Sequence, residues 1–472
     1  MKRFLAFPAH SGSLLFVLSS LYILEGSVLL AVMALHKNGD SPFASLLTGR
    51  YSPFFLSGLI GALLSTGYLI AQYDRTSAHK TRQFWLTVAT NLVTVVLLAM
   101  AGELAIRLLS SPAPRGSQFL DTPLIPYSWD RVAAHYGDIL RANPNHISYF
   151  VADDLLGWTI GPSRLSRDGL YASSREGIRS PRPGIAYAER TPAYRIALLG
   201  DSFTFGLEVP FEDTWGARLE QNLGPQAQVL NFGVDGYGVD QSYLRYQRDA
   251  RPWHPDLVIL GFINHDLYRS LAVYSFLSFP DWGFPFAKPR FILSKDGVLL
   301  ANTPLPRPET IFASRSITDL PYLQYEPGYH ADEWEWHPLY RSFLVRWLFS
   351  RFPRALEPGA DAIDETLISL NHEILLSFIK LAKTEGSTPL VVYFPTRGDF
   401  KGEQFVLEKR WEKERVLVQL HDQQIEYIDL TACLSRIPPG ELFIAGRPHY
   451  SALGNRAVAD CLMPAVTELL AH

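Results

Sequence analysis

The residues best suited to chemistry are a serine and a histidine that lie far apart in the chain. Ser202 comes directly after Gly200 and Asp201, at the end of the apolar run 196–199. Such a run predicts a buried parallel strand, and open α/β sheets bind ligands where their strands end. A serine hydroxyl is a weak nucleophile that needs a base to accept its proton, and His449 is the candidate base. The alternative interpretation is that Ser202 is a turn residue bonded to its own backbone.

Two further segments that follow predicted strands are suited to holding the oxyanion of an acyl-transfer reaction. Segment 231–238 is rich in glycine and includes Gly233, and segment 261–266 includes Asn264 and His265. Glycines let a backbone approach closely and offer N–H groups to an anion. We therefore expect an oxyanion hole made of the N–H groups of Ser202 and Gly233 and the side chain of Asn264, or of His265 in its place.

These segments lie in a region where strand and helix patterns alternate. Short apolar runs predict strands, and apolar stripes at helical spacing predict the helices between them. The alternation predicts an α/β fold, with a parallel sheet and helices on both of its faces. The predicted strands are residues 196–199, 229–232, 257–262, 390–394 and 425–430, and the predicted helices are 215–223 with Asp213 as N-cap, 241–250, 367–381, 407–420 and 452–470.

The first hundred residues have a different character. Three apolar runs, at about 13–35, 54–72 and 84–106, approach the ~20 residues needed to cross a bilayer. Basic residues before the first run and between the second and third favour a cytoplasmic N-terminus. We therefore expect a multi-pass protein of the inner (cell) membrane whose C-terminal domain is periplasmic or extracellular. Glu25 lies within the first run, and we interpret it as packing against a neighbouring span, with a functional role as the alternative.

The remainder of the chain is predicted to be a linker and one large domain. Residues 110–145 begin with a stretch rich in Pro, Arg and Ser and are interpreted as the linker, and 146–472 as the extracytoplasmic domain. An insertion at about 267–358 separates the third and fourth strands, and Asp296-Gly297 predicts a hairpin within it. The insertion is rich in aromatic residues, which suit carbohydrate stacking, a partner surface or the core of a small cap: Tyr322, Tyr325, Tyr329, Trp334, Trp336 and Tyr340.

Charge and cysteine content narrow the range of ligands. The net charge is −4 and no long basic run occurs, so no nucleic-acid partner is expected. Cys433 and Cys461 lack zinc-type spacing, and we expect neither a metal nor a cofactor. The two cysteines either pair in an oxidising compartment or remain buried thiols.

The motif-bearing segments resemble the SGNH/GDSL hydrolase family over roughly residues 195–265 and 388–470. The resemblance is closest to membrane-anchored members that are O-acyl esterases or acyltransferases of surface polysaccharides. It implies a flavodoxin-like (SGNH-type) α/β/α sandwich and a serine ester hydrolase or O-acyltransferase with no cofactor. The segments that carry the closer resemblance are Asp154 to Trp158, Gly177 to Arg179, Lys288 with the following proline, and Val392 to Pro395.

The chain departs from the family pattern at two places. The third family block is usually Gly-x-Asn-Asp, and the extra residue here leaves either Asn264 or His265 in the place of the asparagine. The family also places an aspartate three residues before the histidine, where this chain has Gly446. Without an orienting carboxylate, the imidazole can hold the wrong tautomer. Another acid, with Asp266 and Asp429 at strand ends as candidates, or a backbone carbonyl would then have to orient the ring.

Two functions of different class follow from these residues. The first is a membrane-anchored serine ester hydrolase or O-acyltransferase that acts on acyl groups of an extracytoplasmic glycan or lipid, or of an acylated small molecule. The second is a catalytically degenerate domain that binds glycan or scaffolds a complex of membrane proteins. A hydrogen bond between the His449 ring and Ser202 Oγ would favour the enzyme.

Overall fold

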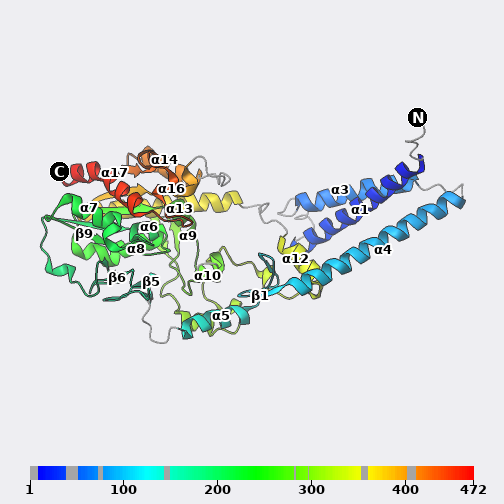
Figure 1. Cartoon of the computed structure of the whole chain (residues 1–472), viewed down its shortest axis with the longest axis horizontal. Coiled ribbons are helices and arrows are strands. Elements are labelled where there is room, and N and C mark those ends of the chain that lie inside the picture. Colours follow the sequence, from blue (N-terminus) through cyan, green and yellow to red (C-terminus); the bar gives the residue numbers. More distant parts are fainter. Residues whose placement is uncertain are drawn as a thin grey trace. The chain divides into compact units, whose positions relative to one another are not determined.

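A seven-stranded sheet forms the centre of the larger of two units in the computed structural model, which describes residues 9–38, 52–72, 78–142, 149–280, 283–295, 297–351, 360–400 and 411–471. The larger unit comprises Ala133–Tyr329 and Ala362–His472, and the smaller comprises Met1–Val132 and His330–Asp361 (Figure 1).

The sheet has the strand order β14-β13-β10-β8-β9-β7-β6. Strands β9, β8, β10, β13 and β14 are parallel, and in chain order they follow the flavodoxin-like pattern 2-1-3-4-5. Strands β7 and β6 extend one edge in the antiparallel sense. The five predicted strands are confirmed, with ends shifted by one or two residues. The bounds are Ala172–Ser173 for β6, Arg179–Ser180 for β7, Tyr194–Leu199 for β8, Ala227–Asn231 for β9, Leu257–Phe262 for β10, Thr388–Tyr393 for β13 and Tyr427–Asp429 for β14.

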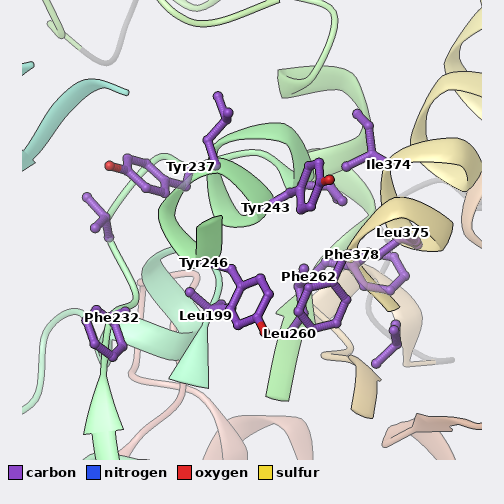
Figure 2. Packing of buried hydrophobic residues seen from close by; sticks show 14 of the residues in the cluster. Leu199, Phe232, Tyr237, Tyr243, Tyr246, Leu260, Phe262, Ile374, Leu375 and Phe378 are labelled. Carbon is purple, nitrogen blue, oxygen red and sulfur yellow. The ribbon is translucent and has the colours of Figure 1, made fainter. Parts of the chain in front are cut away.

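Both faces of the sheet are buried, which explains why its strands are continuous apolar runs. Residues alternate between two cores: Leu199, Leu260 and Phe262 belong to one, and Ile196, Leu198 and Ile259 to the other. On the first face, Tyr246 packs edge-on against Phe378, with ring centroids 5.4 Å apart (Figure 2). Helices α8, α13 and α14 cover this face, and helices α7 and α17 cover the other. The predicted sandwich with helices on both faces is thereby confirmed.

The helices follow the predicted pattern with one corrected cap. Thr214, and not Asp213, caps α7, because the Thr214 side chain accepts a hydrogen bond from the Ala217 N–H. Asp213 instead pairs with Arg218 at 2.6 Å. Residues 407–410 of the predicted helix 407–420 lie outside the described residues. The helix bounds are Ser202–Phe205 for α6, Trp215–Leu223 for α7, Val239–Arg245 for α8, Asn264–Arg269 for α9, Ser275–Ser278 for α10, Pro308–Phe312 for α11, Ala360–Thr384 for α13, Trp411–Asp422 for α14, Thr431–Leu434 for α15, Pro439–Leu442 for α16 and Ala452–Leu470 for α17.

Two hairpins also lie among the described residues of the larger unit. Strands β4 (Phe150–Asp153) and β5 (Gly157–Ile160) pair antiparallel and carry the buried Trp158. Strands β11 (Phe291–Ser294) and β12 (Gly297–Leu300) pair antiparallel, which confirms the predicted hairpin, although Asp296 lies outside the described residues.

Among the described residues of the smaller unit, three helices are long and apolar enough to cross a membrane: α1 (Ala9–Asn38), α3 (Ser52–Gln72) and α4 (Ala78–Leu109). Gly58 brings α3 so close to α1 that a Cβ atom there would lie 2.5 Å from the Ser27 carbonyl oxygen. Asn91 Nδ2 donates a 3.1 Å hydrogen bond to Glu25 Oε1, so α4 supplies a partner for Glu25. This contact agrees with the interpretation of Glu25 as packing against a neighbouring helix.

The predicted linker is not a plain linker. Residues 111–124 form a three-stranded antiparallel sheet, β1 (Ser111–Ala113), β2 (Gly116–Phe119) and β3 (Thr122–Leu124), and α5 (Trp129–Arg141) follows it.

The predicted insertion is divided between the two units, because residues 330–351 belong to the smaller unit with helix α12 (Phe343–Arg351). Glu103 Oε2 on α4 accepts hydrogen bonds from Ser342 Oγ at 2.7 Å and from the Leu344 N–H at 2.8 Å. These bonds attach the start of α12 to α4.

The aromatic residues of the insertion are divided in the same way. Within the smaller unit, the Trp334 ring lies 5.4 Å from Tyr127 and 6.5 Å from Trp129, and Tyr340 lies 6.2 Å from Phe349. For Trp334 and Tyr340, packing within a small core is therefore the better interpretation, over a surface for carbohydrate.

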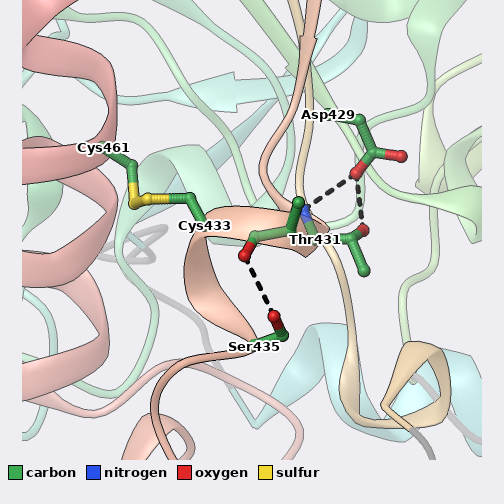
Figure 3. The surroundings of a disulfide bond; sticks show 6 residues. Asp429, Thr431, Cys433, Ser435 and Cys461 are labelled. Carbon is green, nitrogen blue, oxygen red and sulfur yellow. Dashed lines mark hydrogen bonds between the residues drawn. A yellow bond between two sulfur atoms is a disulfide. The ribbon is translucent and has the colours of Figure 1, made fainter.

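Cys433 of α15 and Cys461 of α17 form a disulfide bond (Figure 3). Of the two alternatives that the sequence left open, the structure shows the paired cysteines. The bond ties the segment after β14 to the last helix.

Candidate active site

The candidate nucleophile stands at the carboxyl end of β8, beside the point where the sheet order reverses. Gly200 has φ +149°, and a Cβ atom there would lie 2.6 Å from the Gly261 carbonyl oxygen at the end of β10. Only glycine fits this close approach of two strand ends. Asp201 then caps α6 by accepting a 2.9 Å hydrogen bond from the Phe203 N–H. Ser202 is thus the first residue of α6, at the crevice where such sheets bind ligands.

The structure brings Ser202 and His449 together. His449 Nε2 lies 3.0 Å from Ser202 Oγ although the two residues are 247 positions apart. The Phe203 ring packs against the imidazole, with centroids 5.2 Å apart. Ser202 is 3% exposed, so its hydroxyl is largely shielded from bulk water. The distance lies within the range for direct proton transfer from a hydroxyl to a base.

Glu208 supplies the carboxylate that the sequence lacks at Gly446. Its Oε2 lies 2.9 Å from His449 Nδ1, and Arg447 lies 3.5 Å from Oε1. A carboxylate only accepts, so Nδ1 must carry the hydrogen, and Nε2 is then the unprotonated nitrogen that faces Ser202. The three side chains form the nucleophile, base and acid arrangement of a serine hydrolase.

Local backbone structure fixes the position of Glu208. The N–H groups of Gly206 and Leu207 both donate to the Ser202 carbonyl oxygen, each at 3.0 Å. Glu208 itself has φ +70°, and its N–H donates a 3.0 Å hydrogen bond to the Tyr171 hydroxyl. A positive φ is uncommon for a residue other than glycine and is found where the surroundings enforce it. Sequence reasoning missed Glu208 because no family spacing marks a carboxylate six residues after the serine.

The acids that the sequence suggested are engaged elsewhere. Asp266 accepts from the Ile263 N–H and from Arg269, at 3.0 and 2.6 Å. Asp429 accepts a hydrogen bond from the Thr431 N–H at 2.9 Å (Figure 3). It also accepts one from Lys413 Nζ at 2.9 Å. Neither is bonded to His449, so both suggestions are corrected in favour of Glu208.

A buried ion-pair network lies behind the nucleophile. Arg269 donates to Asp201 Oδ2 at 3.1 Å and to Asp266 Oδ1 at 2.6 Å, and also to the Tyr237 carbonyl oxygen at 3.1 Å. Burial raises the pKa of Asp266, and the neighbouring Asp201 carboxylate raises it further. The Arg269 guanidinium opposes this rise and holds the helix cap next to Ser202 in place.

The predicted oxyanion hole is only partly assembled. Asn264, the first residue of α9, lines the same cavity as Ser202, and its Oδ1 accepts a 3.1 Å hydrogen bond from the Lys413 N–H. The alternative residue, His265, also lines the cavity, and its ring lies 5.1 Å from Phe279. The Gly233 N–H instead donates to Asn231 Oδ1 at 3.0 Å, in a local Asx turn. Gly233 does not line the cavity, so its predicted role is corrected.

The cavity over the nucleophile has a volume of about 650 Å³, within the usual range for small-ligand sites. Its walls combine aromatic, polar and charged side chains from the ends of β8, β9, β10 and β13. Among the described residues, no group of three or more His, Cys, Asp or Glu side chains is arranged to hold a metal ion. The residues lining the cavity are Ser202, Phe203, Asp235, Gly236, Ile263, Asn264, His265, Tyr268, Arg269, Phe284, Thr396, Arg397, Gly398, Pro448 and His449.

No protein-family model matches the chain, and no curated protein matches it in sequence. Solved structures similar to this chain include lipolytic proteins of the G-D-S-L family and acetyl xylan esterases.

A member of the lipolytic protein G-D-S-L family from Veillonella parvula aligns at 14% identity and a TM-score of 0.30, over 58% of this chain and 98% of its own. The acetyl xylan esterase AlAXEase aligns at 15% identity and 0.33, over 58% and 99%. A catalytic mutant of the acetylxylan esterase Axe2 from Geobacillus stearothermophilus aligns at 12% and 0.32, over 58% and 95%. Similarity this weak does not transfer an activity, so the chemistry rests on the residues of this chain.

Proposed function

We propose that the protein is a membrane-anchored serine ester hydrolase or O-acyltransferase that acts on acyl groups of an extracytoplasmic glycan or lipid. The observation that carries the proposal is the continuous line of hydrogen bonds from Ser202 through His449 to Glu208, at 3.0 and 2.9 Å. A complete nucleophile, base and acid set argues against a domain that has kept only the fold.

The reaction follows from these positions. Ser202 Oγ attacks the ester carbonyl carbon while His449 Nε2 accepts the hydroxyl proton, and Glu208 stabilises the imidazolium. The Ser202 N–H and the Asn264 side chain are the proposed donors to the oxyanion. Collapse of the tetrahedral intermediate breaks the bond to the leaving alcohol, which takes the proton from His449. Water or a second hydroxyl group then attacks the acyl-serine by the same steps, giving hydrolysis or transfer.

Two features support an extracytoplasmic location. A disulfide between Cys433 and Cys461 persists in oxidising compartments and is rare in the cytosol. Three helices among the described residues are apolar enough to cross a membrane and precede the catalytic unit, and three spans would place the segments before and after them on opposite sides of a membrane. With the N-terminus in the cytoplasm, the cavity would face the glycans and lipids outside it.

Labelling with a serine-reactive fluorophosphonate tests the proposal on the detergent-purified full chain. We expect covalent labelling of the wild-type protein and its loss in Ser202→Ala and His449→Ala, because the first removes the nucleophile and the second its base. Ser166→Ala is the matched control, since Ser166 is a loop serine bonded to Asp168 at 2.5 Å. Labelling that persists in Ser202→Ala, or that is absent from the wild-type protein, would reject the proposal.

A further inference from the structure

Asp235 is a carboxylate in the catalytic cavity for which the triad chemistry has no use. It lines the cavity together with Ser202 and His449, and it is half-buried. The described residues give its carboxyl group no hydrogen bond and no ion pair, in contrast to Asp201 and Asp266, which share Arg269. The carboxyl group of Asp235 is thus partly exposed to the cavity and open to a ligand, and groups with a shifted pKa concentrate at such sites.

The backbone around Asp235 is held in one conformation. The Trp158 indole N–H donates a 2.9 Å hydrogen bond to the Asp235 carbonyl oxygen, and the Val234 N–H donates to the Gly200 carbonyl oxygen at 3.0 Å. Gly236 has φ +79°, and a Cβ atom there would lie 3.3 Å from Trp158 and 3.5 Å from Phe284. The turn is therefore held between the β4–β5 hairpin and the residue that follows β8, so the carboxyl group lies at the cavity wall before any ligand arrives.

The charges around Asp235 indicate the kind of ligand. Burial raises its pKa to about 6, with Arg269 and His449 lowering the pKa and Asp201 and Glu208 raising it. The group is thus mostly ionised at neutral pH and accepts hydrogen bonds.

A cationic ligand would meet Arg269 and Arg397 in the same cavity, so a neutral donor fits better. Phe284 and Tyr268 also line the cavity and offer apolar surface of the kind on which sugar rings stack.

We propose that Asp235 binds a hydroxyl group on the sugar that carries the acyl group, and that it thereby selects acylated glycans over acylated lipids. The inference rests on the proposed esterase or acyltransferase function and names its substrate class. An ester of a simple long-chain alcohol, or of a fully acylated glycerolipid, has no free hydroxyl beside the ester group, so it would leave the carboxylate unpartnered in the occupied cavity.

Comparison of two esters in the detergent-purified full chain tests this assignment. One is a mono-O-acetylated methyl hexopyranoside with its other hydroxyls free, and the other is p-nitrophenyl acetate, which has none. In Asp235→Asn we expect kcat/KM for the glycoside to fall about 10- to 100-fold more than kcat/KM for p-nitrophenyl acetate, mainly through KM, because a hydrogen bond to a charged acceptor is lost. Glu426→Gln is the matched control. Glu426 is exposed and precedes β14, an edge strand of the sheet, whereas Asp235 follows the inner strand β9.

The outcomes separate this inference from the proposed function. An equal fall on both esters, or no fall on either, would overturn the role of Asp235, as would a wild-type protein that cleaves p-nitrophenyl acetate but not the glycoside. Absence of fluorophosphonate labelling would reject the proposed function instead. Calorimetry of methyl hexopyranoside binding to Ser202→Ala, with and without Asp235→Asn, then tests the binding role without turnover, and equal affinities would overturn it.

Discussion

Replacing Glu208, the proposed triad acid, by its amide gives the sharpest test of the site. Glu208→Gln keeps the shape of the side chain but removes the charge that stabilises protonated His449. At the observed 2.9 Å from Oε2 to Nδ1, an effective dielectric constant of about 20 gives about 6 kcal/mol. The Glu208 side chain is 22% exposed, and screening by solvent lowers this interaction energy to about half. We therefore expect kcat to fall about 10²- to 10⁴-fold, with the upper end matching the loss when the triad acid of a serine protease is made an amide.

The assay is hydrolysis of p-nitrophenyl acetate by the detergent-purified full chain. Glu212→Gln is the matched control, because Glu212 is exposed and lies four residues further along the same segment. A second carboxylate offers a rescue: Gly446 has φ +69° and no atom within 4 Å of a Cβ built there, and aspartate tolerates this left-handed conformation better than most residues. Gly446→Asp in the Glu208→Gln background is expected to restore activity at least about ten-fold. An unchanged kcat in Glu208→Gln would refute the assignment of Glu208.

Three further predictions concern stability and positioning. Burial raises the pKa of Asp235 to about 6, so folding favours the protonated carboxyl, and its contribution to stability is lost as pH rises from about 4 to 6. Asp235→Asn should therefore raise the midpoint of thermal unfolding at about pH 8, and the gain should shrink toward pH 4; a gain that grows on acidification would contradict this sign. Replacing Cys433 and Cys461 by serine should lower the free energy of unfolding by about 2–4 kcal/mol in urea melts, and dithiothreitol should then have no further effect. Tyr171→Phe removes the acceptor of the Glu208 N–H and should lower kcat about 3- to 10-fold, while an unchanged kcat would show that the positive φ is held without it.

The sheet was predictable because its signal is local. Four of the five parallel strands are largely buried, and β14 at the edge of the sheet is half-buried. Burial on both faces demands the runs of Ile, Leu, Val and Phe that mark 196–199 and 257–262. The linker prediction failed for residues 111–141, because the three strands there are only three or four residues long and include Pro112 and Pro123, and residues 143–145 of that prediction lie outside the described residues. Short strands with proline resemble a loop in composition, and only their partners reveal them.

The sequence predicted only those site residues that lie in a recognisable motif. Ser202 and His449 stand in blocks with a recognisable spacing, and the structure places them 3.0 Å apart. Glu208 bonds to a residue 241 positions away and lies in no such block. The sequence indicated only that an acid was missing, because Gly446 stands where the family pattern places an aspartate. Gly233 fails for the opposite reason: its motif is present, but the nearby Asn231 side chain uses its N–H.

The position of Glu208 indicates that segment 202–208, and not the loop before His449, must hold its side chains in precise positions. The proposed nucleophile and the proposed acid belong to one segment, since the N–H groups of Gly206 and Leu207 both donate to the Ser202 carbonyl oxygen and Glu208 follows directly. Only the base comes from another loop. His449 lies between Ser202 and Glu208, and segment 202–208 fixes the positions of both of these residues. The loop before His449 then carries no acid, and Gly446→Ala alone should cost stability of about 1 kcal/mol through its positive φ while leaving kcat close to that of the wild type. A large loss of kcat in Gly446→Ala, with the fold intact, would mean that this loop positions the triad after all.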